Sequence, residues 1–556
     1  MDNQKNVQKP WLDAYDAHVP EFLEYADITL DQLFESAINS YKDSVFIRYK
    51  ETVFSYRQIG EYVAQIRKFL FGNGIQKGDR IGLAMPNIPQ FVIAYYGILS
   101  AGGVVVAMNP RYTSKEFWQL INESDVSVIF CMDAHQELLI PMHSEGILET
   151  IISTSVDDYQ SLGDQGHLKK SYKNSIGFNE LLMNEIETGD EKKPDISPND
   201  AAIFQFSGGT TGYPKPAIGM HKNIIANAIQ FSKWCNLEQG KETILAAIPL
   251  YHVYGMVLAL NMGIAIGAQI ILVDDPANIE YLLSQIDAHK ATFYPGVPTM
   301  YHAINNHQNG QNLVYDLKSI KACISGSFTL HPKIKQEFER ITGGKLIEGY
   351  GLSEAPTATH CNPLYGTNKE GSIGLPLPDV DAKIVDITTG KKEMDIGQTG
   401  ELIIRGPQVM LGYHNNIEET ENTIRNGWLY TGDIATMDSD GYFFLVDRKK
   451  SLIKVNGLQV WPNEIESVVN AHPDITESAV GGVPDFESGE RIICWVVLDQ
   501  GAILDTDILR DWCKESIASY KVPNEFIVVD KLPRTGVGKI LRRELISEYT
   551  KNAGLL

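Results

Sequence analysis

The sequence lacks the features that mark secreted proteins, membrane-spanning proteins and proteins that bind metals through cysteine. Its six cysteines are scattered, with no CxxC pair and no regular spacing, so we interpret them as reduced residues and not as disulfides or metal ligands. No stretch approaches the ~20 consecutive apolar residues that span a bilayer. The first residues, MDNQKNVQKPWLDAYD, form neither an apolar signal core nor an Arg/Ser-rich transit pattern. We therefore expect a cytoplasmic protein without a transmembrane segment; peripheral membrane contact is neither indicated nor excluded.

Basic residues are scarce relative to acidic ones. The chain carries 48 Lys and Arg against 70 Asp and Glu, which gives a net charge of −22. A surface for nucleic acid would be basic, so we expect no nucleic-acid partner. A few lysines, arginines and glycine amides can still form a local site for a small anion.

The 556 residues are too many for one ordinary core and predict several domain-sized units. Apolar strand-like runs alternate with helix-length segments through most of the chain, as at 80–86, 126–132, 268–275 and 291–298. This alternation is typical of parallel α/β layers. A polar stretch, 190–200, has the composition of a linker and leads into an apolar strand at 201–206.

The pattern changes after about residue 370. Segments 400–413 and 440–448 are typical of short antiparallel strands with glycine punctuation. The last hundred residues or so predict a separate small α+β unit, with helices at 462–473 and 505–517 and strands at 475–485 and 491–498. We place the domain boundary at Asp447, where a strand ends in the charged segment DRKK.

The most informative segment, FSGGTTGYPKP at 206–216, follows a buried-type strand directly. Its glycines can adopt backbone angles closed to other residues, so that successive N–H groups converge on an anion. Hydroxyl donors and one lysine complete a set that suits a polyphosphate: Ser207, Gly208, Gly209, Thr210, Thr211, Gly212 and Lys215. It is not a P-loop, because no Lys-Ser/Thr pair follows the last glycine. A flexible turn is the alternative, and the density of glycine, threonine and lysine weighs against it.

This segment resembles the AMP-binding signature of the adenylate-forming superfamily, which includes acyl-CoA synthetases, luciferases and nonribosomal peptide adenylation domains. Further family-like motifs follow in order: IPLYHVYG (248–255), EGYGLSE (348–354), YTGD (430–433), DRKKSLIKVNG (447–457) and PRTGVGK (533–539). The stretch 426–450 is similar to the signature of fatty acyl-CoA synthetases. The resemblance covers nearly the whole chain. It implies ATP- and Mg²⁺-dependent activation of a carboxylic acid, a medium- or long-chain fatty acid, through acyl-AMP to acyl-CoA.

The resemblance also implies the architecture. We expect an α/β fold with a large N-terminal AMP-binding domain, residues 1–446, made of parallel-sheet subdomains and a small β-barrel-like subdomain. A small mobile α+β domain, residues 447–556, would follow, with Asp447 as the hinge. In this family one active site runs two reactions by rotating that domain.

The family motifs assign roles to individual residues of this chain. Glu354 and Thr210 would hold Mg²⁺, Tyr350 would stack on adenine, and Asp433 with Arg448 would bind the ribose hydroxyls. The predicted catalytic residues are Lys539, Glu354, Thr210 and Lys454. The remaining predicted ATP- and AMP-binding residues, beside the glycine-rich set above, are Gly326, Ser327, Phe328, Gly351 and Ser353.

The resemblance further places an acyl pocket and a coenzyme A contact. The acyl pocket would comprise Tyr251, His252, Gly255 and Val297, and Gly457 with Leu458 would meet the pantetheine arm. Lys450, Lys454 and Gln459 match polar positions of related ligases. His252 is equally well explained as a hydrogen-bonded core histidine. Phe328, Ser353 and Pro216 depart from the residues usual at these positions.

Three other interpretations stay open at this point. The chain could be an aryl-CoA ligase of the coumarate type, or a fatty acyl-AMP ligase that stops before coenzyme A. It could also be a catalytically silent protein that binds nucleotide or acyl-AMP, although Lys215, Glu354, Asp433 and Lys539 are all present. The sequence does not decide between a monomer and a homodimer.

Overall fold

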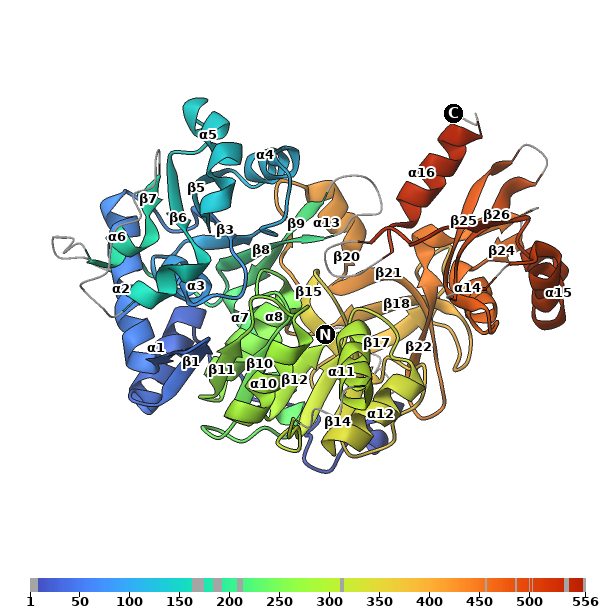
Figure 1. Cartoon of the computed structure of the whole chain (residues 1–556), viewed down its shortest axis with the longest axis horizontal. Helices are drawn as coiled ribbons and strands as arrows, with labels where there is room; N and C mark the ends of the chain where they lie inside the picture. The colour runs from blue at the N-terminus through green and yellow to red at the C-terminus, as the bar shows by residue number, and fades with distance from the viewer. Residues whose placement is uncertain are drawn as a thin grey trace, which may run out of the picture. The chain divides into compact units, whose positions relative to one another are not determined.

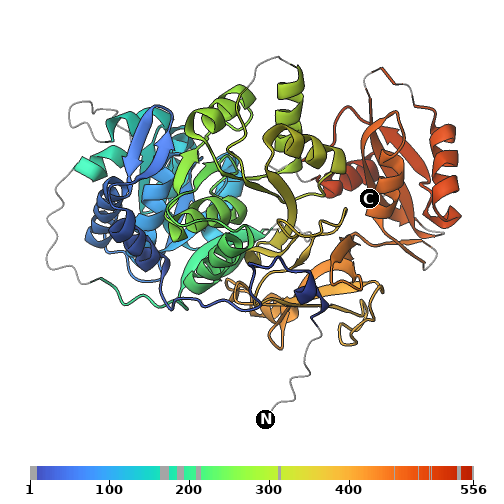
Figure 2. The ribbon, with the colours of Figure 1, turned by 90° about the horizontal axis from the view of Figure 1, so that it is seen from below.

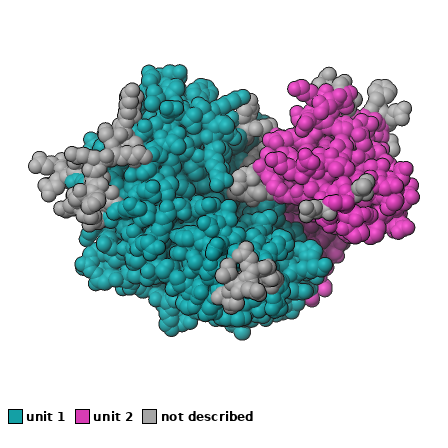
Figure 3. Space-filling view, viewed as in Figure 1, with its two compact units in different colours: residues 1–381, 404–429 teal, residues 382–403, 430–556 magenta. Residues whose placement is uncertain are grey.

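The computed structural model describes residues 9–162, 175–183, 193–207, 214–310, 315–455, 458–485, 488–499, 501–502, 504–534 and 540–553. The chain packs as two compact units, residues 1–381 with 404–429 and residues 382–403 with 430–556 (Figure 3). Units of packing need not coincide with bodies that move, so the boundary predicted between residues 446 and 447 stays a prediction.

Unit 1 contains two large sheets with parallel centres, which confirms the predicted α/β class (Figure 1). The first sheet has the order β16-β15-β14-β13-β12-β10-β11-β1-β2. Its strands are β1 Val45–Tyr49, β2 Thr52–Ser55, β10 Thr243–Ala246, β11 Gln269–Leu272, β12 Phe293–Gly296, β13 Ala322–Ser325, β14 Lys345–Leu352, β15 Ala355–Cys361 and β16 Leu375–Pro376. From β14 to β1 every neighbouring pair is parallel.

The second sheet of unit 1 has the order β19-β9-β8-β4-β3-β5-β6-β7. Its strands are β3 Arg80–Ala84, β4 Val104–Ala107, β5 Val126–Met132, β6 Thr150–Thr154, β7 Ile176–Gly177, β8 Ala201–Ser207, β9 Lys215–Met220 and β19 Gly412–Tyr413. The central strands are mostly apolar and buried because parallel sheets are covered on both faces. The strands predicted at 80–86, 126–132 and 201–206 are confirmed here.

The helices of unit 1 connect and cover these strands. They are α1 Leu30–Tyr41, α2 Tyr56–Gly72, α3 Pro89–Ser100, α4 Ser114–Glu123, α5 Gln136–Ser144, α6 Phe178–Met183, α7 His221–Trp234, α8 Val253–Gly255, α9 Met262–Ala265, α10 Ile279–His289, α11 Pro298–Gly310, α12 Pro332–Thr342 and α13 Ile417–Thr423. Helix α3 is buried on every side, so it is apolar all round and has no polar stripe. A π-helical turn, Met256–Asn261, joins α8 to α9.

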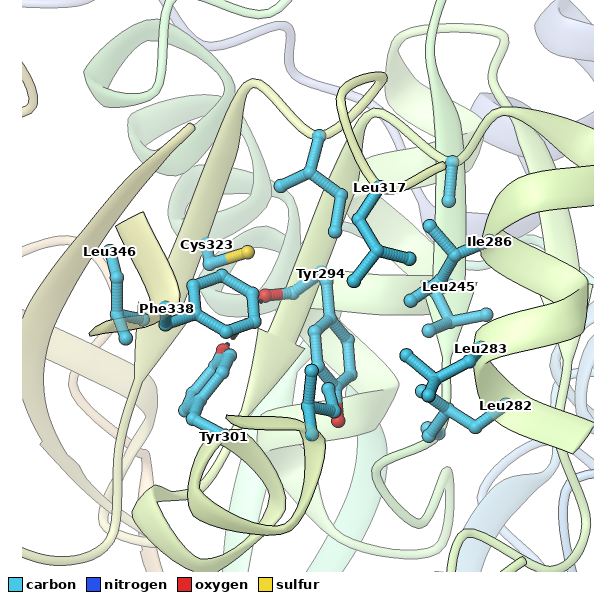
Figure 4. Close-up of a cluster of buried hydrophobic side chains, with 14 of the residues drawn as sticks. Leu245, Leu282, Leu283, Ile286, Tyr294, Tyr301, Leu317, Cys323, Phe338 and Leu346 are labelled. Carbon is cyan, nitrogen blue, oxygen red and sulfur yellow. Dashed lines mark hydrogen bonds between the residues drawn. The ribbon is translucent and has the colours of Figure 1, made fainter. Parts of the chain in front are cut away.

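A core of aliphatic and aromatic side chains fills the space between the first sheet and helices α10, α11 and α12 (Figure 4). Tyr301 of α11 meets Phe338 of α12 edge to face, with ring centroids 4.9 Å apart. The hydroxyl of Tyr301 donates to the carbonyl oxygens of Tyr294 and Ile324, at 3.0 and 2.8 Å. These bonds fix α11 against β12 and β13, whose ends carry predicted site residues.

Residues 9–29 form a short 3-10 helix, Pro10–Ala14, followed by a stretch without helix or strand that runs past α7 to α1 (Figure 2, dark blue). The ring of Tyr15 packs edge to face on Trp234 at the end of α7. Farther along, Asp379 accepts hydrogen bonds from the Leu23 N–H and the Tyr25 hydroxyl. The segment is therefore tied to the body of unit 1 by specific bonds.

A third sheet lies in the segment where the sequence pattern changes, and its β20–β21 and β21–β22 pairs are antiparallel. Its order is β17-β18-β21-β20, with β22 paired to β21. The strands are β17 Asp381–Val385, β18 Gly400–Arg405, β20 Ile424–Arg425, β21 Trp428–Met437 and β22 Phe443–Arg448. The short strands predicted within 400–413 and 440–448 are confirmed.

The C-terminal part of unit 2 is the predicted small α+β body. Its sheet has the order β24-β23-β26-β25, with β27 on β26. The elements are β23 Ile453–Val455, β24 Leu458–Val460, α14 Pro462–Asn470, β25 Ile475–Asp485, β26 Gly489–Leu498, α15 Thr506–Ser516, β27 Glu525–Val528 and α16 Arg542–Asn552. Among the residues that the structure describes, no helix is both long enough and apolar enough to cross a bilayer.

Candidate active site

The strand ends of the first sheet collect most of the predicted residues of unit 1. Parallel strands deliver their carboxyl ends to the same edge, where α/β proteins bind ligands. Tyr251 and His252 follow β10, Val297 follows β12, Gly326 follows β13, and Tyr350 lies near the end of β14. Because β10, β12, β13 and β14 are successive neighbours, these positions follow one another along the same edge of the sheet.

The ends of the glycine-rich segment are held by a β-hairpin in the second sheet. Ser207 closes β8 opposite Lys215, the first residue of β9. The Ser207 hydroxyl donates to the Lys215 carbonyl oxygen at 3.4 Å. Gly208, Gly209, Thr210, Thr211 and Gly212 lie outside the described residues, so their predicted phosphate contacts stay predictions.

Lys215 and Glu354 both contact Tyr413, a residue that the motifs did not indicate. The Tyr413 hydroxyl donates to Glu354 Oε1 at 2.8 Å, and Lys215 Nζ lies 5.8 Å from the centre of the Tyr413 ring. Burial, followed by the Glu354 charge, raises the pKa of Tyr413, which stays a neutral donor. Tyr413 follows a glycine in a short apolar run, MLGY, and that aromatic was the only sequence signal.

Lys215 also forms an ion pair with Glu419 of α13. Lys215 Nζ lies 2.7 Å from Glu419 Oε1, and the two side chains keep 23% and 31% of their exposure. Asn416 is the N-cap of helix α13, and its side chain accepts from the Glu419 N–H at 3.0 Å. The cation predicted to meet phosphate is therefore already held by a partly exposed carboxylate.

The chemistry of Glu354 fits the magnesium role that the sequence predicts for it. Its backbone carbonyl accepts from the Met410 N–H at 2.9 Å, which fixes the residue after the β14 strand. Tyr413 engages Oε1, and Oε2 has no partner among the described residues. A partly buried carboxylate of this kind suits Mg²⁺, which prefers oxygen ligands. Within the described residues no cluster of three or more His, Cys, Asp or Glu side chains could hold a metal by itself.

The segment after β13, predicted to line adenine, is built by close backbone approach. The Gly326 N–H donates to the Gly296 carbonyl at 3.2 Å, and a Cβ at Gly326 would lie 3.1 Å from the Tyr254 ring. The Tyr254 hydroxyl bonds the carbonyl oxygens of Gly296 and Ile324, so it ties β12 to β13 beneath this segment. Ser327 has φ of 72°, a left-handed conformation that costs a non-glycine residue about 1 kcal/mol or more.

Tyr350 and Gly351 lie in the part of β14 that pairs with the antiparallel strand β15. Tyr350 is buried, and its ring meets His360 at a centroid distance of 5.9 Å. A Cβ at Gly351 would fall 1.8 Å from the Thr357 carbonyl oxygen, so only glycine fits there. Phe328 and Ser353 are half-buried, beside the exposed Ser327 and Gly351.

Glu348, two residues before Tyr350, makes a polar contact, and the motifs assigned no role to this residue. Its Oε2 accepts from the Leu330 N–H at 3.2 Å and so supports the segment that begins at Gly326. Removal from water raises the pKa of the Glu348 carboxyl from 4.5 to about 8. The carboxyl is therefore largely protonated at neutral pH.

The predicted acyl residues surround the start of α8. His252 Nδ1 accepts from the Tyr254 N–H at 3.2 Å and caps this helix, and burial lowers the His252 pKa to about 4. His252 therefore has a structural role as a helix cap, and its role in the acyl pocket stays a prediction. A Cβ at Gly255 would lie 2.4 Å from the Pro249 carbonyl oxygen, so this position also requires glycine. Tyr251 and Val297 are half-buried.

In unit 2 the two predicted ribose contacts lie together. Asp433 and Arg448 are paired in the β21–β22 register, and Arg448 Nε lies 2.7 Å from Asp433 Oδ1. The turn before Asp433 is fixed because the Thr431 hydroxyl donates to the Leu402 carbonyl oxygen at 2.7 Å. Beside it, Lys449 Nζ lies 2.7 Å from the buried Glu401 carboxylate.

The predicted hinge and coenzyme A residues occupy different surroundings. Asp447 is 4% exposed, and burial raises its pKa. Lys450, Lys454 and Leu458 are exposed, with Lys454 on β23 and Leu458 on β24. Gly457 and Lys539 lie outside the described residues, and of the Gln459 side chain only its place on β24 is known.

The comparisons with known proteins establish the family. The model of the AMP-binding enzyme family matches residues 34–414, and that of the AMP-binding enzyme C-terminal domain matches residues 464–539. The chain therefore belongs to the AMP-binding enzyme family. It is 40% identical to a long-chain-fatty-acid–CoA ligase of Bacillus subtilis, over 98% of this chain and 99% of that protein. A protein of the same name from Escherichia coli O157:H7 is 36% identical over 98% of both.

Solved structures support the same fold. ATP-bound MatB from Rhodopseudomonas palustris superposes with a TM-score of 0.82 at 26% identity, covering 94% of this chain and 99% of MatB. The anthranilate CoA ligase AuaEII, in complex with anthranoyl-AMP, gives a TM-score of 0.82 at 24% identity, over 96% and 99% of the two chains, and shares the fold.

The raised pKa of Glu348 predicts that the free energy of unfolding depends on pH. Between pH 4.5 and 8 the unfolded chain releases this proton while the native protein keeps it, so the free energy of unfolding falls as pH rises. Glu348→Gln removes that loss and keeps an acceptor for the Leu330 N–H. We expect the stability of the variant relative to wild type to rise by roughly 1–4 kcal/mol from pH 5 to pH 8. Thermal unfolding at several pH values measures this.

The control is Glu370→Gln, the same change at an exposed position of unit 1. It should follow the wild-type pH profile. A constant difference between Glu348→Gln and wild type across the pH range would contradict the raised pKa.

Proposed function

We propose that this chain is an AMP-forming fatty acid–CoA ligase that acts on long-chain acids. The observation that carries the proposal is its 40% identity, over nearly its full length, to a long-chain-fatty-acid–CoA ligase. The carboxylate oxygen of the acid attacks the α-phosphorus of ATP, and pyrophosphate leaves. The thiol of coenzyme A then loses its proton and attacks the acyl carbon, and AMP leaves.

The first step brings one anion against another, so donors and cations must surround the phosphates. In this proposal Ser207, the glycine-rich amides and Lys215 cradle the phosphates, and Tyr350 with Gly326 to Phe328 encloses adenine. Mg²⁺, held by Glu354 and Thr210 and bound together with ATP, would neutralise phosphate charge. Lys539 contacts the α-phosphate and the incoming carboxylate, as a mobile point charge can.

The acid itself occupies the region near α8 and the ends of β10 and β12. Tyr251, His252, Gly255 and Val297 line its entrance in this proposal. A neutral His252, with a pKa of about 4, adds no charge to an apolar tunnel at neutral pH. Each buried CH₂ of the acid contributes about 0.8 kcal/mol, which favours long chains wherever the tunnel is deep enough.

The second step is assigned to the small domain. With Asp447 as the pivot, the domain withdraws Lys539 and presents Lys454, Gly457 and Leu458 to coenzyme A. The exposure of Lys454 and Leu458 on the β23–β24 pair leaves both side chains accessible to a ligand.

The test of the function is ATP-dependent release of AMP and pyrophosphate across acids from acetate to palmitate, plus coumarate, with and without coenzyme A. We expect coenzyme A-dependent turnover that is highest with long aliphatic acids. A preference for coumarate would indicate an aryl-CoA ligase, and pyrophosphate release without use of coenzyme A would indicate an acyl-AMP ligase. Absence of turnover with every acid would favour the silent nucleotide-binding protein.

Replacing Lys539 separates the two half-reactions. We expect Lys539→Ala to slow acyl-AMP formation by about 100-fold or more, because a charge aimed at the reacting phosphate is lost. Conversion of preformed acyl-AMP and coenzyme A to acyl-CoA should be nearly unaffected. Lys531→Ala, at an exposed lysine of the same unit, is the control. Equal loss of both half-reactions would contradict the two-conformation account.

Glu419 competes with the phosphates for Lys215 in this proposal. A partly exposed ion pair is worth about 0.2–1 kcal/mol, so Glu419→Gln should lower the KM for ATP by roughly 1.5- to 5-fold. Glu418→Gln, the adjacent exposed glutamate, should leave the KM for ATP unchanged. Steady-state kinetics at saturating fatty acid and coenzyme A measure the effect, and a higher KM in Glu419→Gln would show that Glu419 assists binding.

A further inference from the structure

A series of hydrogen bonds in unit 2 connects the flanks of the segment that contains Lys539 to Asp447. Lys539 lies outside the described residues, but both flanks of residues 535–539 are described. Arg534 and Ile540 form an antiparallel bridge, and the Leu541 N–H donates to the Pro533 carbonyl at 2.8 Å. Arg534 also contacts Glu477 of β25 through an ion pair. The base of this segment is therefore fixed to the body of the C-terminal sheet.

Arg542, immediately after this base, begins α16 and makes a two-pronged contact with Glu466 of α14. Its Nε donates to Oε1 at 3.0 Å and its Nη2 to Oε2 at 2.6 Å. Glu466 is 8% exposed and also accepts from the Val480 N–H of β25 at 2.6 Å. This parallel geometry is the strongest arrangement of a guanidinium and a carboxylate.

The same guanidinium reaches Asn463, one helical turn before Glu466 on α14. Arg542 Nη2 donates to Asn463 Oδ1 at 3.0 Å. The other side of Asn463 faces the end of β22: its backbone N–H donates to Asp447 Oδ2 at 2.8 Å, and its Nδ2 donates to the Val446 carbonyl at 3.2 Å. Asn463 thus links the predicted hinge to Arg542.

We propose that Arg542 is a positioning residue, which through Glu466 and Asn463 holds the base of the Lys539 segment at a fixed place relative to Asp447. The inference rests on the proposed function, because the position of this segment affects the reaction only if Lys539 acts in adenylation. Arg542 touches no substrate in this account. It holds the described flank before α16, Ile540 and Leu541, in place relative to α14 and Asp447.

A purely structural ion pair would make a different prediction. Losing one partner of a buried pair leaves the other charge uncompensated and destabilises the whole unit. Such destabilisation would lower both half-reactions together through the amount of folded enzyme. A positioning role lowers the rate of adenylation in the folded protein and spares thioester formation from preformed acyl-AMP.

The test compares Arg542→Gln with Arg543→Gln, the same change at the adjacent exposed arginine. For Arg542→Gln we expect kcat of acyl-AMP formation to fall roughly 10- to 100-fold, the scale of a small misplacement of a reacting group. The KM for ATP and the rate of conversion of preformed acyl-AMP to acyl-CoA should stay within about twofold of wild type. Arg543→Gln should match wild type in all of these measurements.

Arg542→Lys keeps a positive charge beside Glu466 and serves where Arg542→Gln does not fold. A lysine cannot make the bidentate contact with Glu466 and bond Asn463 at the same time. We therefore expect a rate of adenylation between those of wild type and Arg542→Gln. The thermal midpoint should be near that of wild type. Equal loss of both half-reactions, or unchanged adenylation in a folded Arg542 variant, would overturn the proposal. Wild-type protein that forms no acyl-AMP with any acid would overturn the proposed function and this inference with it.

Discussion

The arrangement of the site depends on four neighbouring parallel strands, three of which, β10, β12 and β13, are almost wholly buried. Because β10, β12, β13 and β14 run in the same direction, the loops after them meet at one edge of the sheet. Apolar residues fill these strands because both faces of the sheet are covered. The polar residues of the site therefore come at or after the end of each strand. The tyrosine hydroxyls of Tyr254 and Tyr301 both bond the Ile324 carbonyl oxygen, and they hold this edge in register.

Close backbone approach explains the glycines at this edge better than flexibility does. A side chain at Gly351 would overlap the Thr357 carbonyl, and one at Gly326 would press on the Tyr254 ring. Ser327 is the opposite case, because its backbone is left-handed although it carries a side chain. Glycine would adopt this conformation without strain.

Sequence patterns predicted the elements and the motif residues, but not the contacts between distant segments. The strand at 126–132 and the strand at 475–485 coincide with β5 and β25, because their apolar runs are bounded by clear turn signals. Tyr413 meets Glu354 across 59 positions and Arg542 meets Glu466 across 76, so no local pattern could indicate either pair. Glu348 was inside a recognised motif, yet its role depends on the Leu330 N–H, which the sequence does not locate.

The ion pairs of this acidic chain differ in whether their carboxylates can be displaced. Asp433, Glu401 and Glu466 keep 5%, 5% and 11% side-chain exposure beside Arg448, Lys449 and Arg542, so separating these pairs would strand a buried charge. Glu419 keeps 31% beside Lys215, and water can solvate it once it is released. An enzyme whose substrates are all anions needs cations that are fixed in place and cations that can exchange partners. By burial alone, Lys215 is the exchangeable one of these four, and it lies next to the glycine-rich segment that would receive the phosphates.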